Sequence, residues 1–124
     1  MPIREFKDDD GVVYSDRGEL GAAESEFLAA LRSNPNSAEA HVDLGALYLA
    51  AKRVDDARQH FSAAIQLDPK SPQAHNNLGF VYLEQGQVAQ AVAEFRTALA
   101  LKPDYANARA NLDRALRAGN TKRY

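Results

Sequence analysis

The chain has 124 residues, of which 45% are hydrophobic and 26% charged, with a formal net charge of -2 and no cysteine. This length is that of one domain, and the near-neutral charge gives no electrostatic reason to expect nucleic acid or an anionic membrane as partner. The absence of cysteine excludes disulfides and thiolate metal sites but leaves the redox compartment open.

No run of the sequence has the apolar length of a signal peptide or of a membrane span. We therefore expect a cytoplasmic protein without membrane insertion. A periplasmic protein, or a domain excised from a longer chain, would show the same pattern.

Residues 1–18 do not predict a regular helix, because Asp8, Asp9 and Asp10 stand where a first helix would need an apolar residue. We expect an irregular or degenerate segment. The three aspartates resemble a calcium loop only faintly, since the alternating ligands are missing and Arg17 falls near the position of the closing glutamate. A solvated acidic turn is the expected structure, with no bound metal or cofactor.

Residues 19–36 predict part of a helical hairpin of the kind that recurs later in the chain, that is, a partial repeat. Its helix is predicted over residues 19–33 and places Leu20, Phe27 and Leu31 on one face. No regular helix precedes it to cover that face. The incomplete cover could be supplied by self-association or domain exchange, which would make the protein a homo-oligomer.

Two helical hairpins follow, over residues 38–71 and 72–105. Apolar residues at spacings of three and four predict helices over 38–51, 54–67, 72–85 and 88–101. Pro69 and Pro103 end the second helix of each pair, since proline cannot donate the next helical hydrogen bond. Pro72 suits a first helical turn behind Ser71 as the cap.

A closing helix is predicted over residues 105–118, and a polar tail over 119–124. Gly119 and Asn120 are residue types that commonly end a helix. The outer side of this helix carries Arg109, Arg114 and Arg117, as a helix that caps an array requires.

The two hairpins match each other without a gap when the sequence is shifted by 34 residues. The shift pairs Leu44 with Leu78, Gly45 with Gly79, Tyr48 with Tyr82, Ala57 with Ala91, Phe61 with Phe95, Ala64 with Ala98 and Pro69 with Pro103. This period and these columns resemble the tetratricopeptide repeat, over nearly all of residues 19–118. The resemblance implies an all-α solenoid of antiparallel helix hairpins, wound as a right-handed superhelix.

The paired columns have a packing role. Gly45 and Gly79 leave no side chain where the two helices of a hairpin approach, and we expect Phe61 and Phe95 at the centre of the core. No catalytic constellation is present. His41 and His75 share one column and predict packing rather than metal binding or catalysis, whereas His60 is predicted on a separate, exposed helical face.

The resemblance also implies a binding surface, because the first helix of each repeat lines a concave groove that is the usual peptide site of the family. The candidate groove residues are Val42, Asp43, Asn76, Asn77, Phe80, Asn111, Arg114 and Arg117. Of these, Phe80 is the favoured apolar contact. Two further apolar residues on the same helices, Leu49 and Leu83, either line the groove or pack between adjacent helices.

Within the family, the co-chaperone members clamp a C-terminal carboxylate, and here only Asn77 matches that clamp. Asn77 and Asn111 instead resemble the asparagine ladder of O-linked N-acetylglucosamine transferases, where amides hold a peptide backbone. Asp43 interrupts the ladder at its first rung. An amide both donates and accepts hydrogen bonds, so it suits an extended backbone.

We expect a protein-protein interaction module that binds a short segment of a partner protein and has no catalytic activity of its own. One alternative is a self-assembling scaffold with head-to-tail or domain-exchanged contacts. Residues 1–35 carry four basic and eight acidic side chains, and residues 104–124 carry five basic and two acidic ones. Such asymmetry can favour head-to-tail stacking, and it can equally be solvation of the two ends. A more remote alternative is a fragment of an enzyme.

Overall fold

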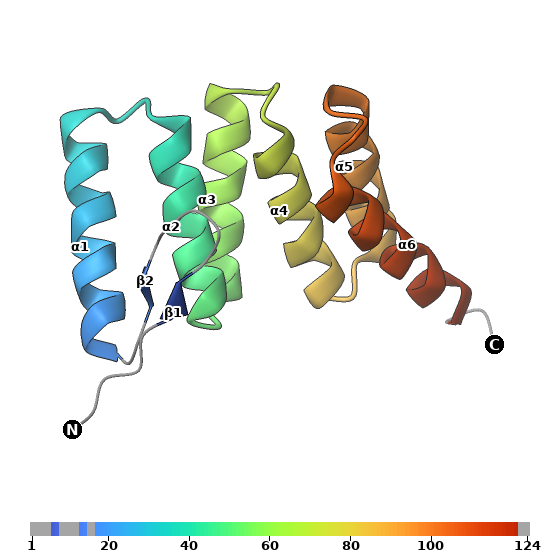
Figure 1. The fold of residues 1–124 in the computed structure, drawn as a ribbon, viewed down its shortest axis with the longest axis horizontal. Coiled ribbons are helices and arrows are strands. Elements are labelled where there is room, and N and C mark those ends of the chain that lie inside the picture. The colour runs from blue at the N-terminus through green and yellow to red at the C-terminus, as the bar shows by residue number, and fades with distance from the viewer. Residues whose placement is uncertain (1–5, 8–12, 15–16, 122–124) are drawn as a thin grey trace.

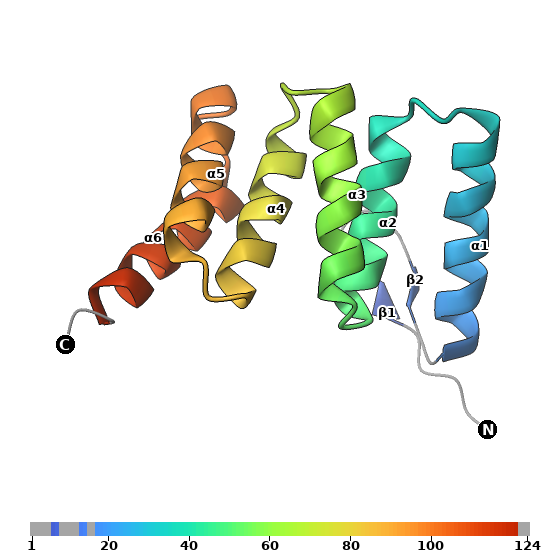
Figure 2. The same cartoon turned by 180° about the vertical axis from the view of Figure 1, so that it is seen from behind.

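The computed structural model describes residues 6–7, 13–14 and 17–121. The elements in these ranges are β1 (Phe6–Lys7), β2 (Val13–Tyr14), α1 (Arg17–Ser33), α2 (Ala38–Ala50), α3 (Val54–Leu67), α4 (Pro72–Glu84), α5 (Val88–Leu101) and α6 (Ala106–Thr121). The helices follow one another in chain order from α1 at one end to α6 at the other (Figures 1 and 2). The fold is the expected all-α solenoid of antiparallel hairpins.

The first helices of the two hairpins begin in the same way. The hydroxyl of Ser37 accepts a hydrogen bond from the backbone N–H of Ala40 at 3.1 Å, and that of Ser71 accepts one from Ala74 at 3.2 Å. Pro72 occupies the first turn of α4, as predicted. Each serine thus satisfies one of the N–H groups that a helix start leaves without an intrahelical partner.

The turns inside the two hairpins share a left-handed residue. Gly86 has φ 76° between α4 and α5, and Lys52, 34 residues earlier, has φ 67° between α2 and α3. Glycine adopts this conformation without a steric penalty, whereas an L-residue with a side chain is strained there. The first hairpin therefore keeps its turn at some conformational cost.

The core follows the predicted register. Phe61 and Phe95 are both 0% exposed. A β-carbon built on Gly45 would lie 2.5 Å from a ring carbon of Phe61, and one on Gly79 would lie 2.6 Å from the ring of Phe95. Each glycine is thus required for the close approach of its two helices. We call the buried cluster around Phe61 the first core cluster; it consists of Leu44, Leu47, Tyr48, Ala57, Phe61, Leu78 and Val81. At the N-terminal end, the predicted apolar face of α1 packs against this cluster through Leu20, Ala23, Phe27 and Leu31.

The N-terminal region is partly regular. β1 and β2 form an antiparallel pair in which Phe6 is opposite Tyr14 and Lys7 opposite Val13, and β2 lies against α1. α1 begins at Arg17, two residues before the predicted start. The expectation of an acidic turn at residues 8–10 falls outside the described residues.

The predicted end of the last helix was wrong. α6 continues through Gly119 and Asn120 to Thr121. Gly119 is half-buried, and a β-carbon on it would lie 3.4 Å from the Val88 side chain, so packing against α5 holds this turn. Glycine ends a helix readily when it takes a positive φ, and Gly119 does not. The predicted polar tail thus begins as helix, and its last three residues lie outside the described part.

The first helices of the repeats (α2, α4 and α6) form one side of the array, and the second helices (α3 and α5) form the other. The first helices of successive repeats touch, α2 with α4 and α4 with α6, whereas α3 and α5 make no direct contact with each other in the described chain. Figure 1 shows α6 crossing in front of α5, and Figure 2 shows α3 and α5 from the opposite side. We call the side formed by α2, α4 and α6 the inner surface.

Candidate functional site

All eight candidate residues lie on the three helices of the inner surface. Val42 and Asp43 are on α2, while Asn76, Asn77 and Phe80 are on α4. The remaining three, Asn111, Arg114 and Arg117, are on α6. Neighbouring helices of this set touch, α2 with α4 and α4 with α6.

Two of the candidate amides bind each other. The side-chain nitrogen of Asn111 donates a hydrogen bond to the side-chain oxygen of Asn76 at 3.0 Å, which joins α6 to α4. Asn76 is only 5% exposed, so this bond satisfies a polar group inside the interface between the two helices. The two residues are 35 apart, one more than the repeat, and a search at the repeat period alone misses the pair.

Asn77 differs from this pair. It is half-buried, and its side-chain amide makes no hydrogen bond within the described part of the chain. The amide retains its donors and its acceptor for a ligand. Asp43, in the same repeat column, is also half-buried.

The apolar candidates are shared between the inner surface and the core. Phe80 is half-buried and packs against the cluster of Ala91, Phe95, Leu112 and Ala115. Val42 is also half-buried and packs against the first core cluster. Leu49 and Leu83 pack against these two clusters as well, in agreement with the alternative that they fill the space between helices.

The α6 end of the inner surface is basic, because Arg114 and Arg117 are both exposed there. A side chain with a planar guanidinium presents several N–H donors to a carboxylate. This end therefore has the charge to attract an acidic group.

The histidines form specific contacts, one of which corrects a prediction. In the second hairpin, Nδ1 of His75 lies 2.8 Å from a carboxylate oxygen of Glu94, and Nε2 lies 2.9 Å from the Pro69 carbonyl oxygen. In the first, Nδ1 of His41 lies 3.0 Å from Nδ1 of His60. His60 is thus half-buried and paired, not on a separate exposed face. The 34-residue shift pairs His60 with Glu94, a signal that could have revealed the contact.

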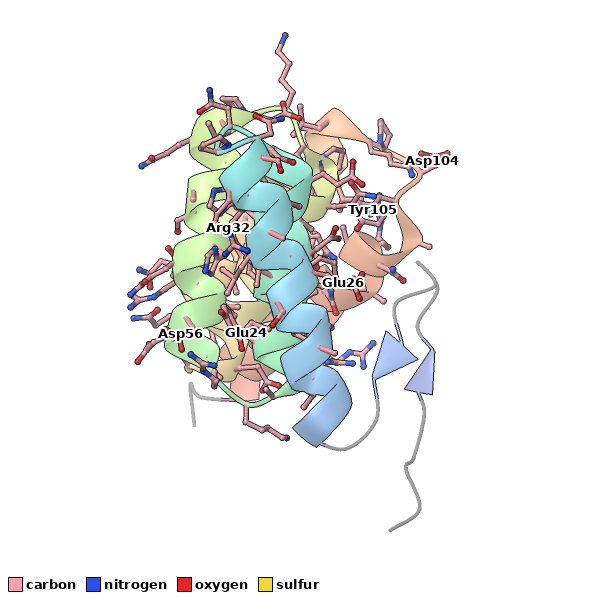
Figure 3. The ribbon with its side chains drawn as sticks, turned by 90° about the vertical axis from the view of Figure 1, so that its left-hand side faces the viewer. Glu24, Glu26, Arg32, Asp56, Asp104 and Tyr105 are labelled. Atoms are coloured by element: carbon pink, nitrogen blue, oxygen red, sulfur yellow. The ribbon has the colours of Figure 1, made fainter. Side chains whose placement is uncertain are left out.

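A second polar cluster joins α1 to the first hairpin. The Tyr48 hydroxyl donates to Glu24 at 2.6 Å, and the Arg53 guanidinium lies 4.4 Å from the centre of the Tyr48 ring. Arg53 also contacts Glu24 at 3.7 Å and Asp56 at 2.8 Å; Figure 3 labels both carboxylates. Burial, and then the bond to Glu24, raises the pKa of Tyr48 to about 12. This cluster stabilises the end of the array and offers no reactive group.

Within the described residues, no group of three or more His, Cys, Asp or Glu side chains could hold a metal ion. None of the helices described here has the length and apolar character needed to cross a membrane.

Sequence comparison decides the family. Two models of the tetratricopeptide repeat match the chain, one over residues 11–72 and the other over residues 49–118. The chain belongs to the tetratricopeptide repeat family. No curated protein matches this tetratricopeptide repeat chain.

Solved structures show the same repeat architecture. An O-GlcNAc transferase mutant from Thermobaculum terrenum is 33% identical with a TM-score of 0.75, and the match covers 80% of this chain and 19% of that one. A thermophilic tetratricopeptide repeat protein from Thermus thermophilus, TTC0263, is 29% identical with a TM-score of 0.73, over 81% and 51% of the two chains. The chain therefore spans about a fifth and about a half of these two proteins.

The tetratricopeptide repeat domain of Arabidopsis OM64 is 23% identical with a TM-score of 0.77, and the match covers 81% of this chain and 83% of that one. At this identity the likeness concerns the fold alone.

Proposed function

We propose that this tetratricopeptide repeat chain is an interaction module that binds a short, extended segment of a partner protein along its inner surface, without catalysis. The observation that carries the proposal is the half-buried side-chain amide of Asn77, which makes no hydrogen bond within the described residues and lies on the same helix as the half-buried Phe80. A peptide backbone would satisfy both the donor and the acceptor of such an amide.

The neighbouring residues give the segment its chemistry. Val42 and Phe80 offer apolar contact at the α2 and α4 positions, and Arg114 and Arg117 offer positive charge at the α6 end. We therefore expect a segment with an apolar residue near its middle and an acidic group toward the α6 end. The likeness to the O-GlcNAc transferase, which covers 19% of that chain, supports the repeat fold and carries no catalytic proposal here.

The role of Asn111 is modified by its bond to Asn76. Asn111→Ala would leave the buried Asn76 amide without its partner. We therefore expect this substitution to lower the free energy of unfolding by about 1–3 kcal/mol, the cost of one unpaired buried polar group, and to weaken binding as well. Asn77→Ala removes no side-chain hydrogen bond within the described residues and is the cleaner test of the inner surface.

The experiment is selection of peptides from a random display library, followed by calorimetric titration of the selected peptides against variants. Asn77→Ala is expected to weaken binding by about 0.5–1.5 kcal/mol, the value of one hydrogen bond, with an unchanged melting temperature. Arg114→Glu is expected to slow association and reduce its dependence on salt.

Arg96→Glu is the matched control for Arg114→Glu, because Arg96 is exposed on α5 and the two substitutions change the charge equally. Binding that survives Asn77→Ala and Arg114→Glu but is lost in Arg96→Glu would place the site on the outer surface and overturn the proposal.

A second candidate function, a self-assembling scaffold with domain-exchanged contacts, is favoured by the incomplete cover of Phe27 on α1. Phe27 is half-buried, while its counterparts Phe61 and Phe95 are 0% exposed. The first helix of a repeat in another copy could cover Phe27. The α6 helix is poorly suited to this role, because Asp113 stands in the column of Gly45. Sedimentation analysis across a range of concentrations tests this candidate, and a monomer throughout would exclude it.

A further inference from the structure

The two full repeats differ at one contact between their first and second helices. In the second repeat the contact joins His75 on α4 to the Glu94 carboxylate on α5, at 2.8 Å. In the first repeat it joins two imidazoles, since His60 takes the place of Glu94, and the Nδ1 atoms of His41 and His60 lie 3.0 Å apart. The same position thus pairs two bases in the first hairpin and a base with a carboxylate in the second.

Two ring nitrogens at this distance share one proton. One Nδ1–H donates and the other Nδ1 accepts through its lone pair, so at least one ring must be neutral. When both rings are protonated, two donors and two positive charges face each other and the hydrogen bond is lost. Acid has the reverse effect on a histidine-glutamate contact, because protonation of His75 adds a positive charge beside a carboxylate.

Within the described residues, the carboxylates near the pair already have partners. The ring of Tyr48 on α2 lies beside His60, and Asp56 on α3 acts on the charge of His60. Arg53 before α3 and Glu24 of α1 contact these two residues in turn. Asp56 binds Arg53 at 2.8 Å, and Glu24 accepts the Tyr48 hydroxyl hydrogen bond at 2.6 Å.

Burial of the ring, and then the charge of His41, lowers the pKa of His60 below its usual value of 6.5, against a smaller opposing effect of Asp56. The folded protein therefore keeps His60 neutral at pH values where the unfolded chain binds a proton. The stability that depends on this group is fully present above pH 6.5 and is lost as the pH falls from 6.5 through the lowered folded pKa.

We propose that the His41–His60 contact makes the packing of α2 against α3 acid-sensitive, so that mild acid loosens the first full repeat before the second. Because α2 carries Val42 and Asp43, acid would also weaken ligand contact at that end of the inner surface; this consequence alone rests on the proposed function. The described residues offer this pair no third side chain with which to hold a metal ion.

The first experiment compares melting temperatures between about pH 7.5 and 5.0. His60→Gln keeps a polar side chain that does not titrate, and His60→Glu recreates the contact of the second repeat. Loss of one hydrogen bond lowers the melting temperature of a domain of this size by about 3–6 °C. Between these pH values, we expect the melting temperature of the wild type to fall by about 3–6 °C more than that of His60→Gln. The melting temperature of His60→Glu is expected to fall least.

The reciprocal variant, Glu94→His, places two histidines in the second repeat and is expected to increase the loss of melting temperature in acid. Equal losses in the wild type and both His60 variants would overturn the proposal. Peptide binding is not needed for this readout, so failure here is distinct from failure of the proposed function.

A second measurement needs no substitution. Nuclear magnetic resonance of the imidazole nitrogens in the wild type follows each ring through its titration. We expect the ring of His60 to titrate below pH 6.5. Titration of His60 at or above pH 6.5 would contradict the shared-proton contact.

Discussion

At the scale of single residues, the two matching tyrosines of the hairpins have different roles. Tyr48 is buried and donates a 2.6 Å hydrogen bond to Glu24, which ties α2 to α1. Tyr82 occupies the same column in the second hairpin, is half-buried and makes no hydrogen bond through its side chain in the described part of the chain. The Tyr48 hydroxyl therefore contributes to holding α1 at the end of the array.

We predict that Tyr48→Phe lowers the free energy of unfolding by about 1–2 kcal/mol, because it removes the hydrogen bond from the buried Tyr48 hydroxyl to the half-buried Glu24 carboxylate. Tyr82→Phe is the matched control, with an expected change of less than about 0.5 kcal/mol. Urea unfolding measures both. Equal losses in the two variants would show that the bond to Glu24 contributes nothing specific.

The same tyrosine predicts an alkaline dependence. The folded-state pKa of Tyr48 is raised to about 12 from 10.0. Its stabilising contribution is therefore fully present below pH 10.0 and is lost as the pH rises through the folded value, because the unfolded chain releases its proton first. Phenolate absorbance should show a tyrosine that ionises at about pH 12, and the loss of this step in Tyr48→Phe assigns it to Tyr48.

At the scale of helices, the distance between the two members of a hairpin is set by glycine against phenylalanine. A β-carbon on Gly45 would approach the Phe61 ring to 2.5 Å, closer than packed carbon atoms allow. In contrast, a β-carbon on Gly21 in α1 meets nothing within 4 Å. The two glycines are both helical, so they separate helix propensity from helix packing.

We predict that Gly45→Ala lowers the free energy of unfolding by about 1–3 kcal/mol, since the Phe61 ring or the helix must move. Gly21→Ala should instead raise it by about 0.5–1 kcal/mol, because alanine loses less backbone freedom in a helix than glycine does. Thermal unfolding checks both signs. A stabilising Gly45→Ala would mean that α2 and α3 are farther apart than described.

At the scale of the whole molecule, stability comes from a row of contacts between neighbours. α3 packs on α4 as well as on α2, so the two hairpins share one interface, and α1 and α6 close the ends. Repeat arrays of this kind are stabilised by their units and by the interfaces between adjacent units. Phe61 and Phe95 are the large buried side chains at the centre of the two hairpins.

We predict that Phe61→Ala and Phe95→Ala each lower the free energy of unfolding by about 3–5 kcal/mol, because each leaves a cavity between packed helices. A protein of this size has about 5–15 kcal/mol in total, so either variant should be close to unfolding at 37 °C. Urea titration provides the measurement, and losses below about 1 kcal/mol at both positions would contradict the core register.

The amino-acid sequence by itself determined the architecture. The signals were local or periodic. They include the serine cap before α4, the prolines after α3 and α5, and packing residues such as Gly45 and Phe61 that recur after 34 residues. A residue type at a fixed spacing is sufficient to predict a repeated hairpin, since every copy must bury the same face.

The tertiary structure decided which polar side chains meet. Asn76 binds Asn111, one residue off the repeat spacing, and His60 turns toward His41 instead of the solvent. It also decided that α6 passes through Gly119, because packing against Val88 outweighs the weak helix preference of glycine. The physical reason is the same in each case: such contacts depend on the offset and rotation of one helix against another, and spacing along a single chain does not specify these.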